Sequence, residues 1–526
     1  MEKLPPSIFN DVIGPVMRGP SSSHTAASVR IARMASDILG QPLHKAVFEF
    51  DPRGSLATTF DGQGSAMGLA AGFLGFQMVD ERMKDALEIA RDSGIHLEFV
   101  VIPYENDHPN TYKMKLTGKN GESLELFAIS SGGGMIEFIG FNGFAISSLG
   151  DYHEAFIFLD QLGASEEKKI SELLEVSGRV DKFLFLKNGK QYLLNIKSSA
   201  GPVEDLAEQV KKMASNCRIF CAGPVMPVLS RKNLEVPFLS AEEALKACGD
   251  KQPWEVAALY ESRRSGFSVS QVLAMMQEIV EIMDDSILQG LQGNEYEDRL
   301  VGHQSHLIEK AMKSNRLIGD SLVNRIVAAT MAMMEVKSSL GVIVAAPTAG
   351  SCATLPGAII TTGKELELDY TDMAKAMLVA GLIGVFIAGK STFAAELAGC
   401  QAECGSATGM AAAALVQMAG GNLKESFDAA SMALQNIFGL ACDPVANRVE
   451  IPCLGKNIMA GVNALASANM ALAGVDAVIP LDEVIAAMDK TGRSLPYEIR
   501  CTGYGGLSIT PTAMRLEMEL KAKATK

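Results

Sequence analysis

Cysteine is the residue type in this sequence best suited to holding a metal. The chain has nine cysteines, and Cys400, Cys442 and Cys453 occur in the contexts GCQAECG, ACDPVAN and IPCLGKN. Cysteine thiolates hold iron–sulfur clusters, and three protein thiolates on a four-iron cluster leave one iron open to another molecule. Their spacing follows no short metal-binding motif, so metal ligation and plain burial as small apolar side chains both stay open on spacing alone.

Two loops combine hydroxyl side chains with glycine and proline. The first loop, GPSSSHTA, precedes an expected helix and carries Ser21, Ser22, Ser23, His24 and Thr25. The second loop, APTAGSC, carries Thr348, Ala349, Gly350 and Ser351. Hydroxyls and free N–H groups at a helix N-terminus can bind an anion such as a carboxylate. Taken alone, each loop is more simply explained as an ordinary helix cap.

The sequence predicts an α+β protein with three regions that must position these residues. Residues 1–147 mix β-branched and aromatic runs with helical segments, which indicates a mixed α/β domain. Residues 148–225 predict the βαββαβ order of a ferredoxin-like module. A proline-broken linker at 226–253 leads to an all-helical domain at 254–526, apart from a candidate strand at 342–346.

Composition and charge limit the classes of partner. The 526-residue chain has a net charge of -14, which argues against nucleic acid or an anionic membrane as its main partner. Its N-terminus lacks an apolar signal core, and its longest apolar run, 376–389, is too short to span a bilayer. The odd number of cysteines disfavours a disulfide framework. These features predict a cytoplasmic protein.

Together the segments resemble the iron–sulfur L-serine dehydratases. GPSSSHT, APTAGSC, GCQAECG, CDPVANRVEIPCLGKN and the closing TGYGGLSITPTAMR follow the family's order along nearly the whole chain. GSLATTFDGQG, HPNT and SSGGGMI also match the family's β-type region. The resemblance implies one polypeptide that fuses a β-type domain, an ACT-like module and an α-type catalytic domain.

The resemblance also implies an activity and a cofactor. Cys400, Cys442 and Cys453 would hold a [4Fe-4S] cluster, whose open iron acts as a Lewis acid on the substrate hydroxyl. The implied reaction converts L-serine to pyruvate and ammonium through an enamine, without pyridoxal phosphate. The GPSSSHT loop and Lys456 are the implied catalytic elements, while the PTAGS loop and Asn457 are the implied substrate-binding elements.

Several alternatives stay open beside this resemblance. No single base follows from the sequence: His24 is the most natural titrating group, and Lys456 is equally a carboxylate ligand or a solvated lysine. Gln63 and Ala66 stand where the family carries histidine and aspartate, so L-cysteine, L-threonine or another β-substituted amino acid is an alternative substrate. An amino-acid-sensing regulatory protein with an inactive catalytic half is the alternative function.

Further expectations concern partners and neighbouring cysteines. The ACT-like module implies an amino-acid effector, and a homodimer is the expected assembly. Nucleic acid and membrane are not expected partners. Cys404, close in sequence to Cys400, is expected to be a buried small residue rather than a ligand.

Overall fold

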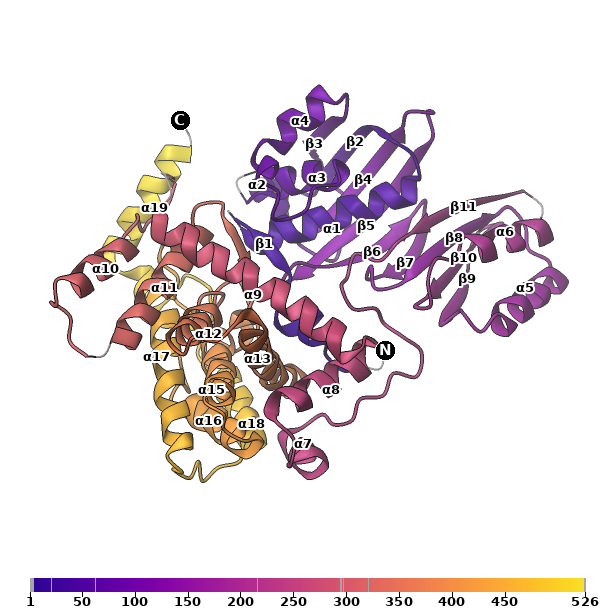
Figure 1. The fold of residues 1–526 in the computed structure, drawn as a ribbon. Helices are drawn as coiled ribbons and strands as arrows, with labels where there is room; N and C mark the ends of the chain where they lie inside the picture. The colour runs from indigo at the N-terminus through magenta and orange to yellow at the C-terminus, as the bar shows by residue number, and fades with distance from the viewer. Residues whose placement is uncertain are drawn as a thin grey trace. The chain divides into compact units, whose positions relative to one another are not determined.

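A computed structural model describes residues 4–524, except for Pro20, Gly62, Ser215, Asn294, Glu295, Glu297 and Asp320. The chain packs as two compact units (Figure 1). One unit is Pro20–Leu234, and the other combines Met1–Gly19 with Glu235–Lys526. The predicted boundary at residue 147 therefore lies inside a unit, and the N-terminal segment packs with the helices that come later in the sequence.

The unit Pro20–Leu234 contains two β-sheets. The first sheet has the order β3-β2-β4-β5-β6-β7, in which β2 and β3 are parallel and the other pairs are antiparallel. Its strands are β2 (Leu43–Phe50), β3 (His96–Val101), β4 (Thr111–Gly118), β5 (Ser123–Gly132), β6 (Met135–Phe141) and β7 (Phe144–Ser148). Its helices are α1 (Ser22–Leu39), α2 (Leu56–Thr59), α3 (Ser65–Phe73) and α4 (Ala86–Asp92). Alternate residues Leu124, Leu126 and Ala128 of β5 are buried, as expected for a strand with one core face.

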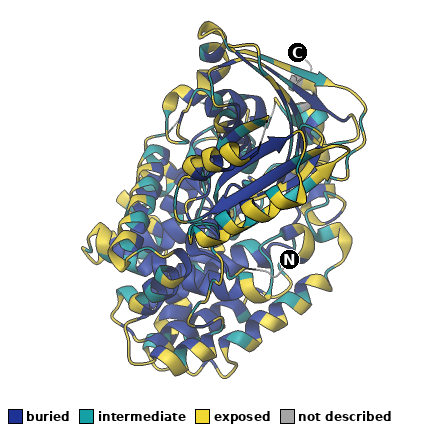
Figure 2. Cartoon of the chain, turned by 90° about the vertical axis from the view of Figure 1, so that its right-hand side faces the viewer, coloured by how far each residue is buried: buried dark blue, intermediate teal, exposed yellow. Residues whose placement is uncertain are grey.

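The second sheet follows the chain order β8-α5-β9-β10-α6-β11 and the spatial order β11-β8-β10-β9. Its elements are β8 (His153–Leu159), α5 (Ala164–Val176), β9 (Lys182–Asn188), β10 (Gln191–Ser198), α6 (Glu204–Met213) and β11 (Cys217–Ala222). The outer faces of its helices are exposed, whereas strand residues beneath them are buried (Figure 2). Phe141 of β6 makes edge-to-face contacts with Phe158 and Phe220, at centroid distances of 4.9 and 5.3 Å, which joins the two sheets in one core.

The other unit is almost entirely helical. Its main helices are α7 (Ala241–Cys248), α8 (Pro253–Ser265), α9 (Val269–Gln292), α10 (Ser305–Lys313), α11 (Ser321–Lys337), α12 (Thr354–Glu365), α13 (Tyr370–Lys390), α14 (Ala395–Ala398), α15 (Ser406–Met418), α16 (Leu423–Gln435), α17 (Cys453–Leu472), α18 (Leu481–Arg493) and α19 (Pro511–Ala524). α15 packs against α13, α16 and α17 (Figure 1). Alanine and glycine along α15 permit this close approach: a Cβ on Gly409 would lie 2.8 Å from the Leu434 side chain.

The N-terminal segment docks onto this helical unit through a π-helix, η1 (Ile8–Val12). Ile8 and Val12 lie against two glycines of α13, where a Cβ on Gly381 or Gly384 would approach them within 2.5 and 2.1 Å. A short strand, β1 (Val16–Arg18), then pairs antiparallel with β12 (Val342–Val344), which lies in the candidate strand at 342–346. The N-terminal segment thus completes a core formed by residues far away in sequence.

Among the described residues, α13 is the one helix long and apolar enough to cross a membrane. However, 78% of its apolar stretch is buried inside the helical unit. Its hydrophobicity on all sides is that of a core helix surrounded by other helices.

Glu261 of α8 anchors the N-terminal segment from inside the core. Its carboxylate accepts hydrogen bonds from the Ser7 hydroxyl at 2.8 Å and the Ile8 N–H at 2.7 Å. Burial raises the pKa of Glu261 from 4.5 to about 7, against the opposing effect of these hydrogen bonds. Glu261 therefore stays protonated in the folded protein at pH values where it has already lost its proton in the unfolded chain.

This linkage predicts a stability loss with rising pH. The contribution of Glu261 is fully present below pH 4.5 and is lost as the pH rises towards 7, at a cost of about 3 kcal/mol. We expect Glu261→Gln to flatten the fall of the thermal midpoint between pH 5 and 7, measured by calorimetry. Replacement of the exposed Glu278 with glutamine serves as the control, and an unchanged profile in Glu261→Gln would contradict the assignment.

Candidate metal centre

The three predicted cysteines lie in two loops and at the start of one helix of the helical unit. Cys400 follows α14 and precedes a π-helical turn, η3 (Gln401–Gly405), Cys442 lies in the loop after α16, and Cys453 is the first residue of α17. All three side chains are buried, with exposed fractions of 1%, 3% and 4%. π-helical turns are rare and often occur at functional sites.

The sulfur atoms form a group that includes two cysteines not predicted as ligands. Cys501 packs against Cys400 and Cys442, and the Cys404 thiol donates to the Gly350 carbonyl at 3.9 Å beside them. The candidate ligand atoms of Cys400, Cys442 and Glu403 all lie within 4.8 Å of one another. Cys400, Cys442 and Glu403 thus surround a small volume inside the protein, Cys501 packs against them, and Cys404 and Cys453 lie near enough for the charge of Cys400 to affect them.

Backbone pairing holds Cys442 and Cys501 together. The Cys442 N–H donates to the Ile499 carbonyl, and the Cys501 N–H donates to the Cys442 carbonyl, each at 2.8 Å. Cys501 has a φ of +62°, a left-handed conformation that is uncommon for residues other than glycine. Such backbone strain clusters at functional sites.

Thiol–thiol contacts shift the acidities of the group. Hydrogen bonds from Cys404 and Cys442 hold the pKa of Cys400 well below its usual value, so that its thiolate is favoured. The same contacts raise the pKa values of Cys404 and Cys442. Burial, followed by the charge of Cys400, raises the pKa of Cys453 to about 12. The group concentrates soft sulfur donors, which iron–sulfur clusters require.

The PTAGS loop closes on this group through a carboxylate. The Thr348 hydroxyl donates to Glu403 at 2.6 Å, and it accepts from the N–H groups of Gly350 and Ser351 at 3.1 and 3.3 Å. Burial, followed by the nearby Cys400 thiolate, raises the pKa of Glu403 to about 8. A Cβ on Gly350 would lie 2.6 Å from the Glu403 carboxylate, so the close approach depends on glycine.

Ser351 and Ala349 are the two remaining predicted residues of the PTAGS loop. Ser351 is fully buried, and its hydroxyl donates to the Ala346 carbonyl at 3.0 Å. Ala349 lies between these hydrogen-bonded residues. Since the two loop N–H groups already bind Thr348, a carboxylate would have to displace that hydroxyl to reach them.

Asn457 ties the PTAGS loop to α17. Its side-chain NH₂ donates to the Gly350 carbonyl at 2.8 Å and to the Cys453 carbonyl at 2.9 Å. Its side-chain oxygen accepts from the Ala353 N–H at 3.2 Å and the Thr354 hydroxyl at 2.9 Å. The buried amide is therefore fully hydrogen-bonded and links a predicted ligand to the loop.

Lys456 supplies a fixed positive charge at the site. Its ammonium donates to Asp443 at 2.8 Å and to the Ala441 carbonyl at 2.6 Å. Burial lowers its pKa, but the negative charges of Cys400 and Asp443 more than compensate and raise it. Lys456 therefore stays protonated beside the thiolates, and its side chain is largely shielded from solvent.

The GPSSSHT loop lies in the other unit, at the start of α1. The Ser21 hydroxyl and His24 Nδ1 are 2.8 Å apart, and the Thr25 hydroxyl donates to the Ser21 carbonyl at 3.3 Å. Burial lowers the pKa of His24, which favours the neutral imidazole that a base requires. Among the described residues, the buried Ser22 hydroxyl has no hydrogen-bond partner, and Ser23 is partly buried.

Comparison with known proteins identifies the family. Residues 186–508 match the family model described as serine dehydratase alpha chain. The probable L-serine dehydratase alpha chain of Bacillus subtilis is 38% identical over 249 residues, which cover 47% of this chain and 83% of the relative. The chain belongs to the iron–sulfur L-serine dehydratase family. An L-serine dehydratase of Streptomyces coelicolor aligns over 93% of this chain and 96% of its own length, at 26% identity.

The relatives also support the fused arrangement of this serine dehydratase family member. The probable beta chain of Bacillus subtilis is 44% identical over 146 residues, which cover 28% of this chain and 64% of that relative. Sequences found in two Bacillus subtilis chains thus occur in one polypeptide here, as in the Streptomyces coelicolor protein. This confirms the family and its single-chain form.

The donor set fits the iron–sulfur cofactor of the serine dehydratase family. Buried thiols with a favoured thiolate at Cys400, next to the protonated Lys456, suit a negatively charged sulfur-ligated group. Cys400 and Cys442 lie within mutual reach of one centre, and Cys453 lies close enough for the charge of Cys400 to affect it.

Sequence reasoning missed four residues of the site: Glu403, Cys404, Asp443 and Cys501. Cys404 and Cys400 are four residues apart, a spacing that places two side chains on one helical face and could have indicated their contact. No comparable local signal exists for Cys501, because its contact with Cys442 depends on pairing between segments far apart in sequence.

Proposed function

We propose that this protein converts L-serine to pyruvate and ammonium with a [4Fe-4S] cluster held by Cys400, Cys442 and Cys453. The observation that carries the proposal is the convergence of buried thiols from three separate segments in a chain of the serine dehydratase family. A purely regulatory protein would have no evident need for this sulfur group.

The cluster supplies Lewis-acid chemistry when bound, because its open iron can polarise the β-hydroxyl of serine. The reaction then requires removal of the α-proton and departure of the hydroxyl as water. The resulting enamine tautomerises to an imine, and water hydrolyses the imine to pyruvate and ammonium. Pyridoxal phosphate has no role in this scheme.

The protein residues prepare the site for this chemistry. Lys456 balances the negative charge of the thiolates, and its bond to Asp443 fixes its position. Thr348 orients Glu403 beside Cys400, and Asn457 holds the PTAGS loop against α17. We assign Thr348, Ala349, Gly350 and Ser351 to the substrate-binding side, where exchange of the Thr348 hydrogen bonds would free N–H groups for the substrate carboxylate.

The GPSSSHT loop is proposed to contribute the proton-transfer groups. Ser21 and His24 already share a hydrogen bond, and a neutral imidazole can accept a proton from Ser21 or directly from substrate. Ser22, Ser23 and Thr25 complete this catalytic loop in the proposal. We further propose a cytoplasmic homodimer whose ACT-like module at 148–225 binds an amino-acid effector.

The direct functional test is a coupled assay for 2-oxo acid and ammonium with anaerobically purified protein. We expect L-serine to give pyruvate at a rate well above those for L-threonine, L-cysteine and D-serine. Sulfide release from L-cysteine with little turnover of L-serine would overturn the substrate assignment. No turnover of any of these amino acids by iron-loaded protein would overturn the proposed activity.

Gly350→Ala tests the contact between the PTAGS loop and Glu403. The added methyl group would displace the carboxylate from Thr348, and we expect L-serine turnover to fall about tenfold because small displacements of positioning groups slow catalysis. Gly389→Ala in α13 is the matched control, since a Cβ there meets open space. Equal turnover in both variants would show that the Glu403 position is unimportant.

A further inference from the structure

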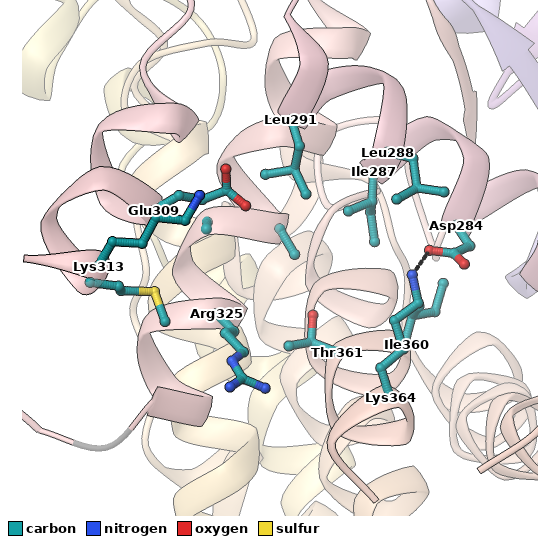
Figure 3. A pocket seen from close by; sticks show the side chains of 13 residues that line it. Asp284, Ile287, Leu288, Leu291, Glu309, Lys313, Arg325, Ile360, Thr361 and Lys364 are labelled. Carbon is teal, nitrogen blue, oxygen red and sulfur yellow. Dashed lines mark hydrogen bonds and ion pairs between the residues drawn. The ribbon is translucent and has the colours of Figure 1, made fainter. Parts of the chain in front are cut away.

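A cavity of about 320 Å³ lies between α9, α10, α11 and α12, within the helical unit (Figure 3). None of its lining residues belongs to the cysteine group. Its walls are mainly apolar and include Ile287, Leu291, Met312, Ala328, Ala329 and Ile360. The volume is at the lower end of the range for small-molecule pockets, roughly 300–1,000 Å³.

Small residues on α11 create this space. Ala328 and Ala329 are buried and occupy positions where longer apolar side chains would fill the gap between the helices. Apolar walls of this kind bind water poorly and favour an apolar group. The interior of the cavity therefore selects a ligand with an aliphatic or aromatic part.

Most charged residues around the cavity are already paired. Asp284 accepts from Lys364 at 2.5 Å and from the Tyr370 hydroxyl at 2.8 Å. Arg325 forms an ion pair with Glu365. These pairs hold the charged side chains of α9, α11 and α12 in place at the edge of the cavity.

Glu309 and Lys313 differ from those pairs. Both line the cavity from α10, one helical turn apart, and neither forms a hydrogen bond or ion pair with any other residue that the structure describes. Figure 3 shows both side chains on the same side of the cavity. Opposite charges four residues apart usually pair on a helix, so this arrangement leaves one acceptor and one donor available for a ligand.

We propose that this cavity binds a free α-amino acid with an apolar side chain. Its ammonium group would bind Glu309, its carboxylate would bind Lys313, and its side chain would enter the apolar interior. L-Serine lacks the apolar part that the walls select. The binding of an apolar amino acid here does not depend on the proposed reaction at the cysteine group.

Two of the helices that line the cavity, α11 and α12, also contact residues next to the cysteine group. The far end of α11 carries Lys337, which donates to the Val449 carbonyl at 2.8 Å, in the segment before Cys453. The start of α12 carries Thr354, which hydrogen-bonds to Asn457. A ligand in the cavity would therefore contact the two helices whose opposite ends support the candidate metal centre.

Calorimetric titration of the anaerobic full-length protein with L-leucine tests the proposal. We expect saturable binding, and about tenfold weaker binding of 4-methylpentanoate and 3-methylbutylamine, each of which lacks one of the two charges. L-Isoleucine, L-methionine and L-phenylalanine test the size of the cavity. Absence of binding by all four amino acids, or binding of either analogue as tight as that of L-leucine, would overturn the proposal.

Variants locate the binding. Glu309→Gln and Lys313→Gln should each weaken L-leucine binding about tenfold, while Lys310→Gln, an exposed site on the same helix, should leave it unchanged. Ala329→Leu should fill the cavity and abolish binding without changing iron content. Unchanged L-leucine affinity in Glu309→Gln and Lys313→Gln would place the ligand elsewhere and contradict the proposal.

Discussion

Replacing Cys442 with serine is expected to remove most of the cluster iron and to lower L-serine turnover at least a hundredfold. Cys442 is buried and connects Cys400 to Cys501, so its loss breaks the sulfur group at its centre. A serine hydroxyl stays protonated where a thiolate is needed, and it is a poor ligand for the iron of an iron–sulfur cluster. Iron and sulfide analysis, with visible absorbance, measures the loss independently of activity.

Cys400→Ser and Cys453→Ser are expected to give the same result. Cys248→Ser is the matched control, because Cys248 is a buried cysteine at the end of α7, outside the sulfur group. It should retain iron and activity. Full iron content in all three ligand variants would show that the cluster is not bound where we place it.

Replacing Asn457 with leucine is expected to have the second largest effect. The substitution removes five hydrogen bonds, including one to the Cys404 sulfur, and leaves the N–H of Ala353 buried without a partner. Unsatisfied buried groups of this kind cost about 1–3 kcal/mol each, so we expect a loss of about 3 kcal/mol in stability. Detachment of the PTAGS loop should lower L-serine turnover about a hundredfold.

Calorimetry and the coupled assay measure these two effects separately. Asn469→Leu is the control, because Asn469 is exposed on the same helix, α17. An Asn457→Leu protein that matches this control in thermal midpoint and turnover would contradict the role of Asn457 as the link between loop and helix.

Local sequence patterns predicted the elements better than their assembly. Helical spacing after residue 254 and the βαββαβ pattern at 148–225 both correspond to elements in the structure. Nothing local indicated that the first nineteen residues pack with the helical unit. That contact depends on Glu261 receiving hydrogen bonds from Ser7 and Ile8, more than 250 residues away, and such distant pairing leaves no periodic signal.

The sequence likewise predicted some residues of the candidate site but not how they contact one another. The contexts of Cys400, Cys442 and Cys453 pointed to these residues, and the structure gathers Cys400 and Cys442 with Glu403. Spacing alone left both burial and ligation open. The expectation that Cys404 is buried is confirmed, but its contacts with Asn457 and the Gly350 carbonyl next to the site could not be predicted. The Thr348–Glu403 hydrogen bond also depends on tertiary packing that the sequence pattern does not contain.

The most direct test of the central claim is a Mössbauer spectrum of anaerobic protein loaded with ⁵⁷Fe, recorded with and without L-serine. We expect about four irons per chain, and a change in the signal of one iron when L-serine is added. A protein that stays free of iron after anaerobic reconstitution would contradict the account. So would a bound cluster whose spectrum does not respond to L-serine.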